Sequence, residues 1–231
     1  MQAQTQLTLD LQLKESFTFD NYRVGDNALV LAMLQDAVSE SGERQILIWG
    51  DHFTGKSHLL QAVCHLAARQ SLSVSYLPLA QCMDYPADIL QGLESMDVIC
   101  VDDVQQVAGS PQWQEGLFNL INRVREAGSR LIFTSSLPPN ELPLQLEDLR
   151  SRLNWGPVLA LKTLNDDDKC RALQSRAQSR GFDLPDTVAR YILNNYSRDL
   201  GDLLGTLEKL DQASLSHQRR LTIPFVKTVF A

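Results

Sequence analysis

The sequence predicts an α/β fold, in which a five-stranded parallel β-sheet is flanked by helices and followed by a small helical domain. Two observations carry this prediction: five short apolar runs are typical of buried strands, and segments with helical periodicity separate them. The runs are QILIWG (45–50), VSYLPL (74–79), DVICVDD (97–103), RLIFTSS (130–136) and PVLALKTL (157–164). Strands that alternate with helices favour parallel pairing, with helices on both faces of the sheet.

After Leu164 the strand pattern ends and only helices are predicted. NDDDKCRALQSRAQSRG places acidic residues at the start of a helix, where they complement its dipole, and Gly181 at its end. PDTVARYILNNYS and the amphipathic RDLGDLLGTLEKLDQASL follow, and Pro224 opens a last short helix in LTIPFVKTVF. We therefore expect three parts, which are an N-terminal tail (1–15), the α/β domain (16–162) and a helical lid domain (163–231).

Composition narrows the function classes. The chain has 231 residues, with 44% hydrophobic and 21% charged residues, which is typical of a globular protein. The formal net charge is −7, and from Thr163 onward ten Lys and Arg residues balance nine Asp and Glu residues, so strong direct DNA binding is not expected. No apolar run approaches the roughly 20 residues that span a bilayer and no signal peptide is visible. We expect a cytoplasmic protein with no membrane partner, whose four cysteines are reduced and buried.

The strongest motif is GDHFTGKSHLL, which follows the first predicted strand and matches G-x-x-x-x-G-K-[ST] from Gly50 to Ser57. In such a loop, successive backbone N–H groups and the start of the next helix hold a phosphate. Lys56 would reach the β- and γ-phosphates, and the Ser57 hydroxyl would bind Mg²⁺. The alternative is a chance match in an ordinary strand–turn–helix. His52 and His58 make no triad or metal cluster and are interpreted as incidental, although the candidate nucleotide-binding segment includes them with Asp51, Phe53, Thr54 and Gly55.

A second motif is DVICVDDV, an apolar strand that ends in Asp102 and Asp103 about 45 residues after the loop. In a P-loop protein Asp102 would bind Mg²⁺ and Asp103 would stand where an acid, most often Glu, activates water. The alternative is a strand that ends at a solvated turn.

Arginines supply two further candidates. LEDLRSRLNWG contains Arg150 and Arg152, which either lie on a solvated helix face, paired with Glu147 or Asp148, or present an arginine finger to a neighbouring nucleotide. Arg198, in YSRDLGDLL, is either an exposed charge or a cation that reaches back from the helical domain to the phosphates.

Together these residues resemble the AAA+ family of P-loop NTPases, and within it the replication initiator DnaA. The resemblance runs from FTFDNYRVGDNALVLA (17–32), the nucleotide-clasping segment with Tyr22, through the P-loop and DDVQQVAG (102–109). It continues with FTSSLPPNEL (133–142) as the sensor 1 region, LEDLRSRLNWG (146–156) as the arginine-finger box, and Arg198 at the sensor 2 position. The N-terminal assembly domains and the C-terminal basic helix-turn-helix of DnaA are expected to be missing.

The resemblance gives the N-terminal leucines a candidate role. QLTLDL is similar to the peptide that binds the sliding clamp, the β subunit of DNA polymerase III. Gln6 would bond at the rim of a clamp pocket, and Leu7, Leu9 and Leu11 would belong to the bound segment. The alternative is an edge strand or a tail packed on its own domain.

The resemblance implies a negative regulator of replication initiation. It would bind ADP or ATP with Mg²⁺, attach to the DNA-loaded clamp and use Arg152 in trans to stimulate ATP hydrolysis by DnaA, which becomes inactive ADP-DnaA. Serine at the sensor 1 position (Ser135 or Ser136) and Asp103 in place of Glu predict weak hydrolysis in its own site. Self-association is a further expectation. Three alternatives stay open: an autonomous AAA+ ATPase or helicase loader, a small-molecule P-loop kinase, and a non-enzymatic scaffold.

Overall fold

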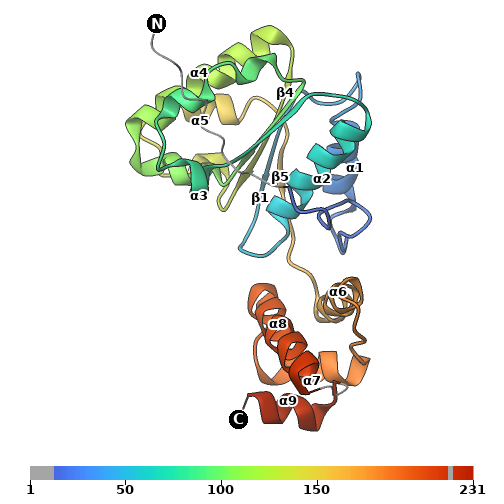
Figure 1. The fold of residues 1–231 in the computed structure, drawn as a ribbon. Coiled ribbons are helices and arrows are strands. Elements are labelled where there is room, and N and C mark those ends of the chain that lie inside the picture. The colour runs from blue at the N-terminus through green and yellow to red at the C-terminus, as the bar shows by residue number, and fades with distance from the viewer. Residues whose placement is uncertain (1–12, 218–220, 231) are drawn as a thin grey trace, which may run out of the picture.

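The computed structural model, which describes residues 13–217 and 221–230, contains the predicted five-stranded sheet (Figure 1). All neighbouring strands are parallel, in the order β2-β3-β4-β1-β5. The strands are β1 (Gln45–Trp49), β2 (Val74–Pro78), β3 (Val98–Asp102), β4 (Arg130–Ser135) and β5 (Val158–Ala160). Each lies inside the apolar run that predicts it, because these runs have the length and composition of strands buried on both faces.

Strand β5 is shorter than predicted from 157–164, and the partners of the following residues give the reason. Leu161 still donates its backbone N–H to Trp49 O (2.7 Å), but Trp49 is the last residue of β1. The backbone of Lys162 then pairs with the side-chain amide of Asn27, at 2.8 and 3.0 Å, instead of with a strand. The end of β1 and the amide of Asn27 therefore end the strand.

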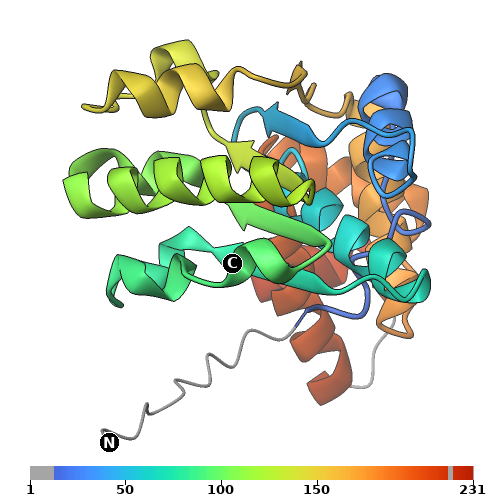
Figure 2. The same cartoon turned by 90° about the horizontal axis from the view of Figure 1, so that it is seen from above.

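Two helical layers cover the sheet, as Figures 1 and 2 show. Helices α1 (Ala28–Asp36) and α2 (Lys56–Arg69) pack on one face, and α3 (Leu79–Cys82), α4 (Pro111–Ala127) and α5 (Glu147–Leu153) pack on the other. Strand β3 is buried along its length, and its side chains contribute to the hydrophobic cores on both faces of the sheet, because alternate side chains of a strand point to opposite faces. Short 3₁₀ helices complete the connections: η1 (Ala87–Leu90), η2 (Leu93–Ser95), η3 (Val104–Gly109) and η4 (Pro139–Glu141).

The helical part has its own core. Helices α6 (Asp166–Ser179), α7 (Asp186–Asn195), α8 (Leu200–His217) and α9 (Ile223–Val229) bury a cluster drawn from residues 170–226. Asn165 caps α6 by accepting a bond from the backbone N–H of Asp168 (2.8 Å), and Gly181 adopts a left-handed φ of +85° after the helix ends. The predicted boundary after residue 162 falls in the connection between β5 and α6.

The register places the predicted motifs at one edge of the sheet. β1 and β4 pair so that Trp49 lies opposite Ser135, and β3 and β4 pair so that Val101 lies opposite Phe133. Parallel strands present their carboxyl ends together, so the P-loop after β1, the acids after β3 and the serines of β4 meet there.

Candidate functional site

The P-loop is a tight turn between β1 and α2. Gly55 holds a left-handed φ of +94° at the N-cap of α2, and Phe53, at the tip, also has a positive φ of 59°. No side chain of the described residues caps the start of α2. The first N–H groups of the helix are therefore directed at the loop, as a phosphate site requires.

Two glycines of the motif are required by close contacts. A Cβ on Gly50 would lie 2.8 Å from Leu161 O, and a Cβ on Gly55 would lie 2.6 Å from Tyr22 Cε2. The loop therefore has room for glycine alone at these positions: packing explains Gly50, and packing together with the positive φ explains Gly55.

Lys56 points back into the loop. Its Nζ donates to Gly50 O and Asp51 O, at 2.7 Å each, and the side chain is only 7% exposed. Burial lowers the pKa of Lys56, while the nearby carboxylates of Asp103, Asp102 and Asp51 oppose this shift. The ammonium thus bonds to the loop backbone and lies near the acids at the end of β3.

Asp102 is a buried carboxylate with a hydroxyl donor on each oxygen. Tyr76, on β2, donates its phenol to Oδ2 (2.7 Å), and Thr134, on β4, donates to Oδ1. The residue is 3% exposed and Thr134 is fully buried. Both neighbouring strands therefore orient the carboxylate toward the P-loop edge.

Asp103 is held differently. It adopts a left-handed φ of 62°, its backbone N–H donates to Thr134 Oγ1 (2.8 Å), and its Oδ1 accepts a bond from Gln105 Nε2 (2.9 Å). Gln105 also accepts the backbone N–H of Ser136 (3.0 Å). Ser135 is fully buried, and its Oγ accepts the N–H of Leu137 (3.3 Å).

The sequence prediction missed three of these residues. Thr134 comes directly before the two serines predicted for sensor 1, so the polar end of FTSS could have indicated it. Which of these hydroxyls faces Asp102 is decided by the alternation of side chains along the strand. Nothing in the sequence marks Tyr76 or Gln105, because their roles depend on strand order and on the turn after β3.

The donor set fits magnesium. Ser57 is half-buried in the first turn of α2, and Asp102 offers a buried carboxylate nearby in the fold. Among residues 13–217 and 221–230 no group of three or more His, Cys, Asp and Glu could hold a metal. An ion with few protein ligands, whose remaining ligands are phosphate oxygens and waters, is characteristic of Mg²⁺.

The predicted clasping segment packs against the loop. The Tyr22 hydroxyl donates to Thr54 O (3.2 Å), and burial raises the pKa of Tyr22 to about 12. His58 stacks on Phe17 with ring centroids 4.7 Å apart, and its Nε2 bonds with Thr18 O (2.8 Å). In this structure His58 therefore holds the segment to α2, while the exposed His52 lies beside Phe53.

A cavity of about 400 Å³ lies between this segment and the start of the lid. Tyr22, Arg23, Val24, Gly25, Asp26 and Asp168 line it. Arg23 and Asp168 form an ion pair (2.9 Å) across it. The volume lies in the range of small-molecule sites, and Tyr22 connects the cavity to the P-loop.

The lid meets the tip of the P-loop at helix α8. The ring of Phe53 lies directly against Gly201, although Phe53 is still 56% exposed. Arg198 is exposed three residues earlier, and its backbone carbonyl accepts a bond from Lys169 Nζ (2.7 Å). The fold thus brings the backbone of the predicted sensor 2 residue near the P-loop tip.

Arg152 lies far from the P-loop of its own chain. Its carbonyl accepts a bond from the side chain of Gln45 (2.7 Å), the first residue of β1, whereas the P-loop follows the last. Five residues of strand separate these ends by roughly 15 Å. Helix α5 also packs on the sheet face opposite to α2. This arginine cannot serve its own nucleotide site.

The guanidinium of Arg152 has neutral partners. Its Nε donates to Asn122 Oδ1 (3.0 Å), and its Cζ lies 3.8 Å from the centre of the Trp155 ring. Arg125 lies 4.0 Å from the same centre, so the two guanidiniums must occupy opposite faces of the indole. No carboxylate of the described residues pairs with Arg152, which is half-buried, and Trp155 is 38% exposed.

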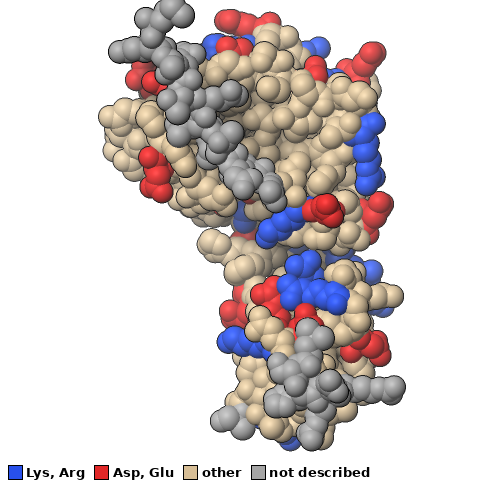
Figure 3. Space-filling model, viewed as in Figure 1, with Lys and Arg blue, Asp and Glu red and all other residues tan. Residues whose placement is uncertain are grey.

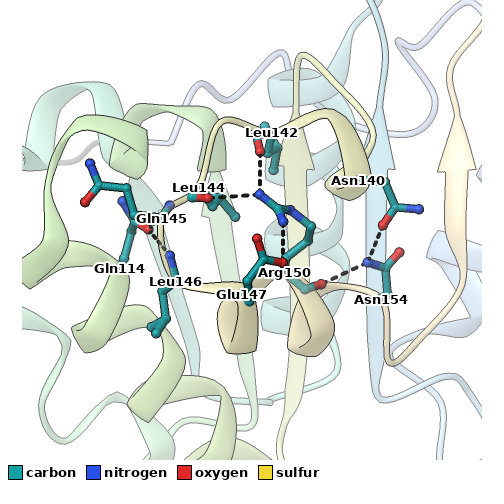
Figure 4. A network of polar contacts seen from close by, with 9 residues as sticks. All are labelled: Gln114, Asn140, Leu142, Leu144, Gln145, Leu146, Glu147, Arg150 and Asn154. Carbon is teal, nitrogen blue, oxygen red and sulfur yellow. Dashed lines mark hydrogen bonds and ion pairs between the residues drawn. The ribbon is translucent and has the colours of Figure 1, made fainter.

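Arg150 has the structural role that the first alternative assigned to such arginines (Figure 4). It pairs with Glu147 and donates through Nη2 to Leu142 O (3.2 Å) and Leu144 O (2.9 Å). It therefore ties the loop before α5 to the helix. The predicted clamp-binding residues Gln6, Leu7, Leu9 and Leu11 lie outside the described residues.

Charges of both signs are interspersed on the face shown in Figure 3, where basic side chains at the narrow junction with the lid lie next to acidic ones. Arg23 and Arg171 both form ion pairs with Asp168, in the first turn of α6. The described helices include none that is long and apolar enough to cross a bilayer. The four cysteines are free and buried, as predicted.

Two family models match the chain. Residues 13–160, more than half of the chain, match the bacterial DnaA ATPase domain, and residues 166–230 match the lid domain of Hda.

Solved structures share the fold. Domain III of the Thermotoga maritima replication initiation protein DnaA is 21% identical, with a TM-score of 0.84 over 94% of this chain and 97% of that one. AMPPCP-bound DnaA from Aquifex aeolicus is 24% identical, with a TM-score of 0.72 over 86% of this chain and 66% of that one. The Thermotoga maritima Holliday junction branch migration motor RuvB is 14% identical, with a TM-score of 0.66 over 87% and 66%.

Proposed function

Because this chain belongs to the bacterial DnaA ATPase family of AAA+ proteins, we propose that it is a nucleotide-bound negative regulator of replication initiation. It stimulates ATP hydrolysis by DnaA, and the product is inactive ADP-DnaA. One observation carries the proposal: Arg152 is a cation with only neutral partners among the described residues, and it lies by the first residue of β1, at the end of the strand opposite to its own P-loop. If this cation acts on a nucleotide, that nucleotide must belong to another molecule.

The protein's own site binds ADP or ATP. Support comes from the glycine-only turn at Gly50 and Gly55, the uncapped start of α2, and the position of Lys56 inside the loop. The AMPPCP-bound relative shares this fold. Ser57 and Asp102 would hold Mg²⁺, which neutralises charge on the phosphates when it is bound. Tyr22 and Arg198 would contact the nucleotide from the clasping segment and the lid.

Hydrolysis in this site is slow. Asp103 has one methylene less than Glu, and its Oδ1 already accepts a bond from Gln105. The buried Ser135 is likewise engaged by the N–H of Leu137. These contacts constrain both side chains, and the shorter Asp103 does not reach as far toward a water as Glu would. The protein is therefore a nucleotide-gated regulator rather than a motor.

The N-terminal tail supplies the tether. Residues Gln6 to Leu11 bind the DNA-loaded clamp, and Arg152 then contacts DnaA in a transient complex. Tethering raises the effective concentration of a weak contact without new interactions. A self-associated form would mask or share the same arginine.

The test follows phosphate release from ATP-loaded DnaA in the presence of DNA-loaded clamp and this protein, with each component omitted in turn. Arg152→Ala is expected to lower stimulation by about 10³-fold or more, because finger arginines supply 10³–10⁵ in rate. Arg69→Ala, at the exposed end of α2, is the matched control and keeps full stimulation. Normal stimulation by the Arg152 variant would refute the proposed role.

A variant that begins at residue 13 separates the tether from the finger. It is expected to lose clamp binding in a pull-down assay and to keep nucleotide binding. If it still binds the clamp, the tail is not the tether, whereas equal phosphate release with and without clamp would remove the clamp from the mechanism.

A further inference from the structure

A partly buried chain of hydrogen bonds connects Lys14, near the start of the described residues, with Asp102, the candidate metal ligand. The backbone N–H of Lys14 donates to Gln61 Oε1 (2.9 Å), and Gln61 Nε2 donates to the hydroxyl of Tyr76 (3.2 Å). The same hydroxyl donates to Asp102 Oδ2 (2.7 Å). Four residues from four separate parts of the chain thus form one continuous connection.

This chain of hydrogen bonds is directional, and it runs from the exposed Lys14 through the half-buried Tyr76 to a buried carboxylate. Gln61 is 6% exposed and Asp102 is 3% exposed. The Asp102 carboxylate can only accept, so the Tyr76 hydroxyl is the donor of the bond between them. A phenol has one proton, which is committed to Asp102, so it must accept the bond from Gln61.

The two hydroxyls on Asp102 have different neighbours. Thr134 donates to Oδ1 and also accepts the N–H of Asp103, so it belongs to the turn after β3. Tyr76 comes from β2 at the edge of the sheet and connects instead to helix α2 and the N-terminal segment. With both oxygens held, the remaining lone pairs of the carboxylate keep one orientation.

We propose that Tyr76 is a positioning residue for the magnesium-binding carboxylate of Asp102, and that Gln61 connects this residue to the backbone of Lys14. The inference rests on the proposed nucleotide function. It makes the edge strand β2 part of the metal site, and it connects that site to the point where the tail joins the fold.

The test measures binding of a fluorescent ADP analogue to the full chain over a range of free Mg²⁺ concentrations and in EDTA. Tyr76→Phe removes only the hydroxyl. We expect the Mg²⁺ concentration that gives half of the Mg²⁺-dependent gain in ADP-analogue affinity to rise about 10-fold, because outer-shell partners change metal affinity 10- to 100-fold. The affinity for the analogue in EDTA is expected to stay unchanged. Gln61→Met is expected to shift the Mg²⁺ midpoint in the same direction by about 3-fold. Tyr85→Phe, a half-buried tyrosine after α3, is the matched control and keeps the wild-type midpoint.

The outcomes separate the two proposals. Wild-type protein that binds no nucleotide would refute the proposed function itself. If Tyr76→Phe binds the ADP analogue tightly with the wild-type Mg²⁺ midpoint, the positioning role alone is overturned. The same holds if the variant loses equal affinity for the analogue with and without Mg²⁺, because that is the result of a merely structural defect. A wild-type midpoint for Gln61→Met would overturn the connection to Lys14.

Discussion

Arg150 and Arg152 show how two identical side chains, two positions apart on α5, acquire different roles. Positions i and i+2 point to nearly opposite sides of a helix, so one arginine turns to the preceding loop and the other to α4. Arg150 satisfies two backbone carbonyls, whereas Arg152 stacks on Trp155 and bonds to Asn122. Both roles were open for the pair; the helix phase gives Arg150 the structural contacts and turns Arg152 toward α4, where the finger role stays a prediction.

At this scale we predict that Arg150→Met destabilises the protein. The variant leaves the carbonyls of Leu142 and Leu144 without their donor, which costs about 1–3 kcal/mol of unfolding free energy. Glu147→Gln changes the free energy of unfolding by less than about 1 kcal/mol, because Glu147 is largely exposed in its ion pair with Arg150. Urea denaturation measures both, and equal losses in the two variants would contradict the assignment.

At the scale of the elements, the P-loop is one strand–turn–helix unit whose two glycines are fixed by contacts with other segments. Strand β1 delivers Gly50 against Leu161, and the first turn of α2 begins at Lys56 with Gly55 pressed against Tyr22. The apolar run and the motif were enough to predict this unit. The contact with Tyr22 was not predictable from spacing, since it joins residues 33 positions apart.

Two glycines with similar backbone angles test this element. Gly55 (φ +94°) would clash with Tyr22 on gaining a Cβ, whereas Gly181 (φ +85°), after α6, has no atom within 4 Å of that position. We expect Gly181→Ala to cost about 1–2 kcal/mol from φ alone. Gly55→Ala should cost more and weaken nucleotide binding at least 10-fold, because it displaces the cradle. Calorimetric titration with ADP and urea denaturation measure the two effects, and unchanged ADP affinity in Gly55→Ala would contradict the assigned cradle.

At the scale of the whole molecule, the N-terminal segment joins the two domains. It packs on α2 through His58, lines the cavity beside the lid with Tyr22, and holds the lid through the Arg23–Asp168 pair. Asn27 fixes the start of the connection to the lid. The contacts with α2, with the cavity and with the lid therefore all come from one short stretch of chain.

This arrangement predicts a pH dependence of stability. Burial lowers the pKa of His58 below its ordinary value of 6.5, and Arg176 of the lid lowers it further, while the bond to Thr18 O opposes the shift. The unfolded chain then binds the proton more strongly, so stability is complete above pH 6.5 and falls as the pH drops below it toward the folded-state pKa. His58→Gln should flatten this slope in urea denaturation between pH 7.5 and 5.5. The exposed His52→Gln serves as control, and a wild-type slope in the His58 variant would contradict the linkage.

The sequence alone determined the fold class and the local chemistry. Apolar runs, helical periodicity and the Gly50–Ser57 motif depend on neighbours along the chain, so they were readable without coordinates. Only the tertiary structure decided that Tyr76 and Thr134 hold Asp102, that Arg150 is structural, and that Arg152 lies at the opposite end of the sheet from its own P-loop. These facts depend on strand order, on register and on which helix covers which face, and such long-range pairings are set by packing between segments that the linear pattern does not relate.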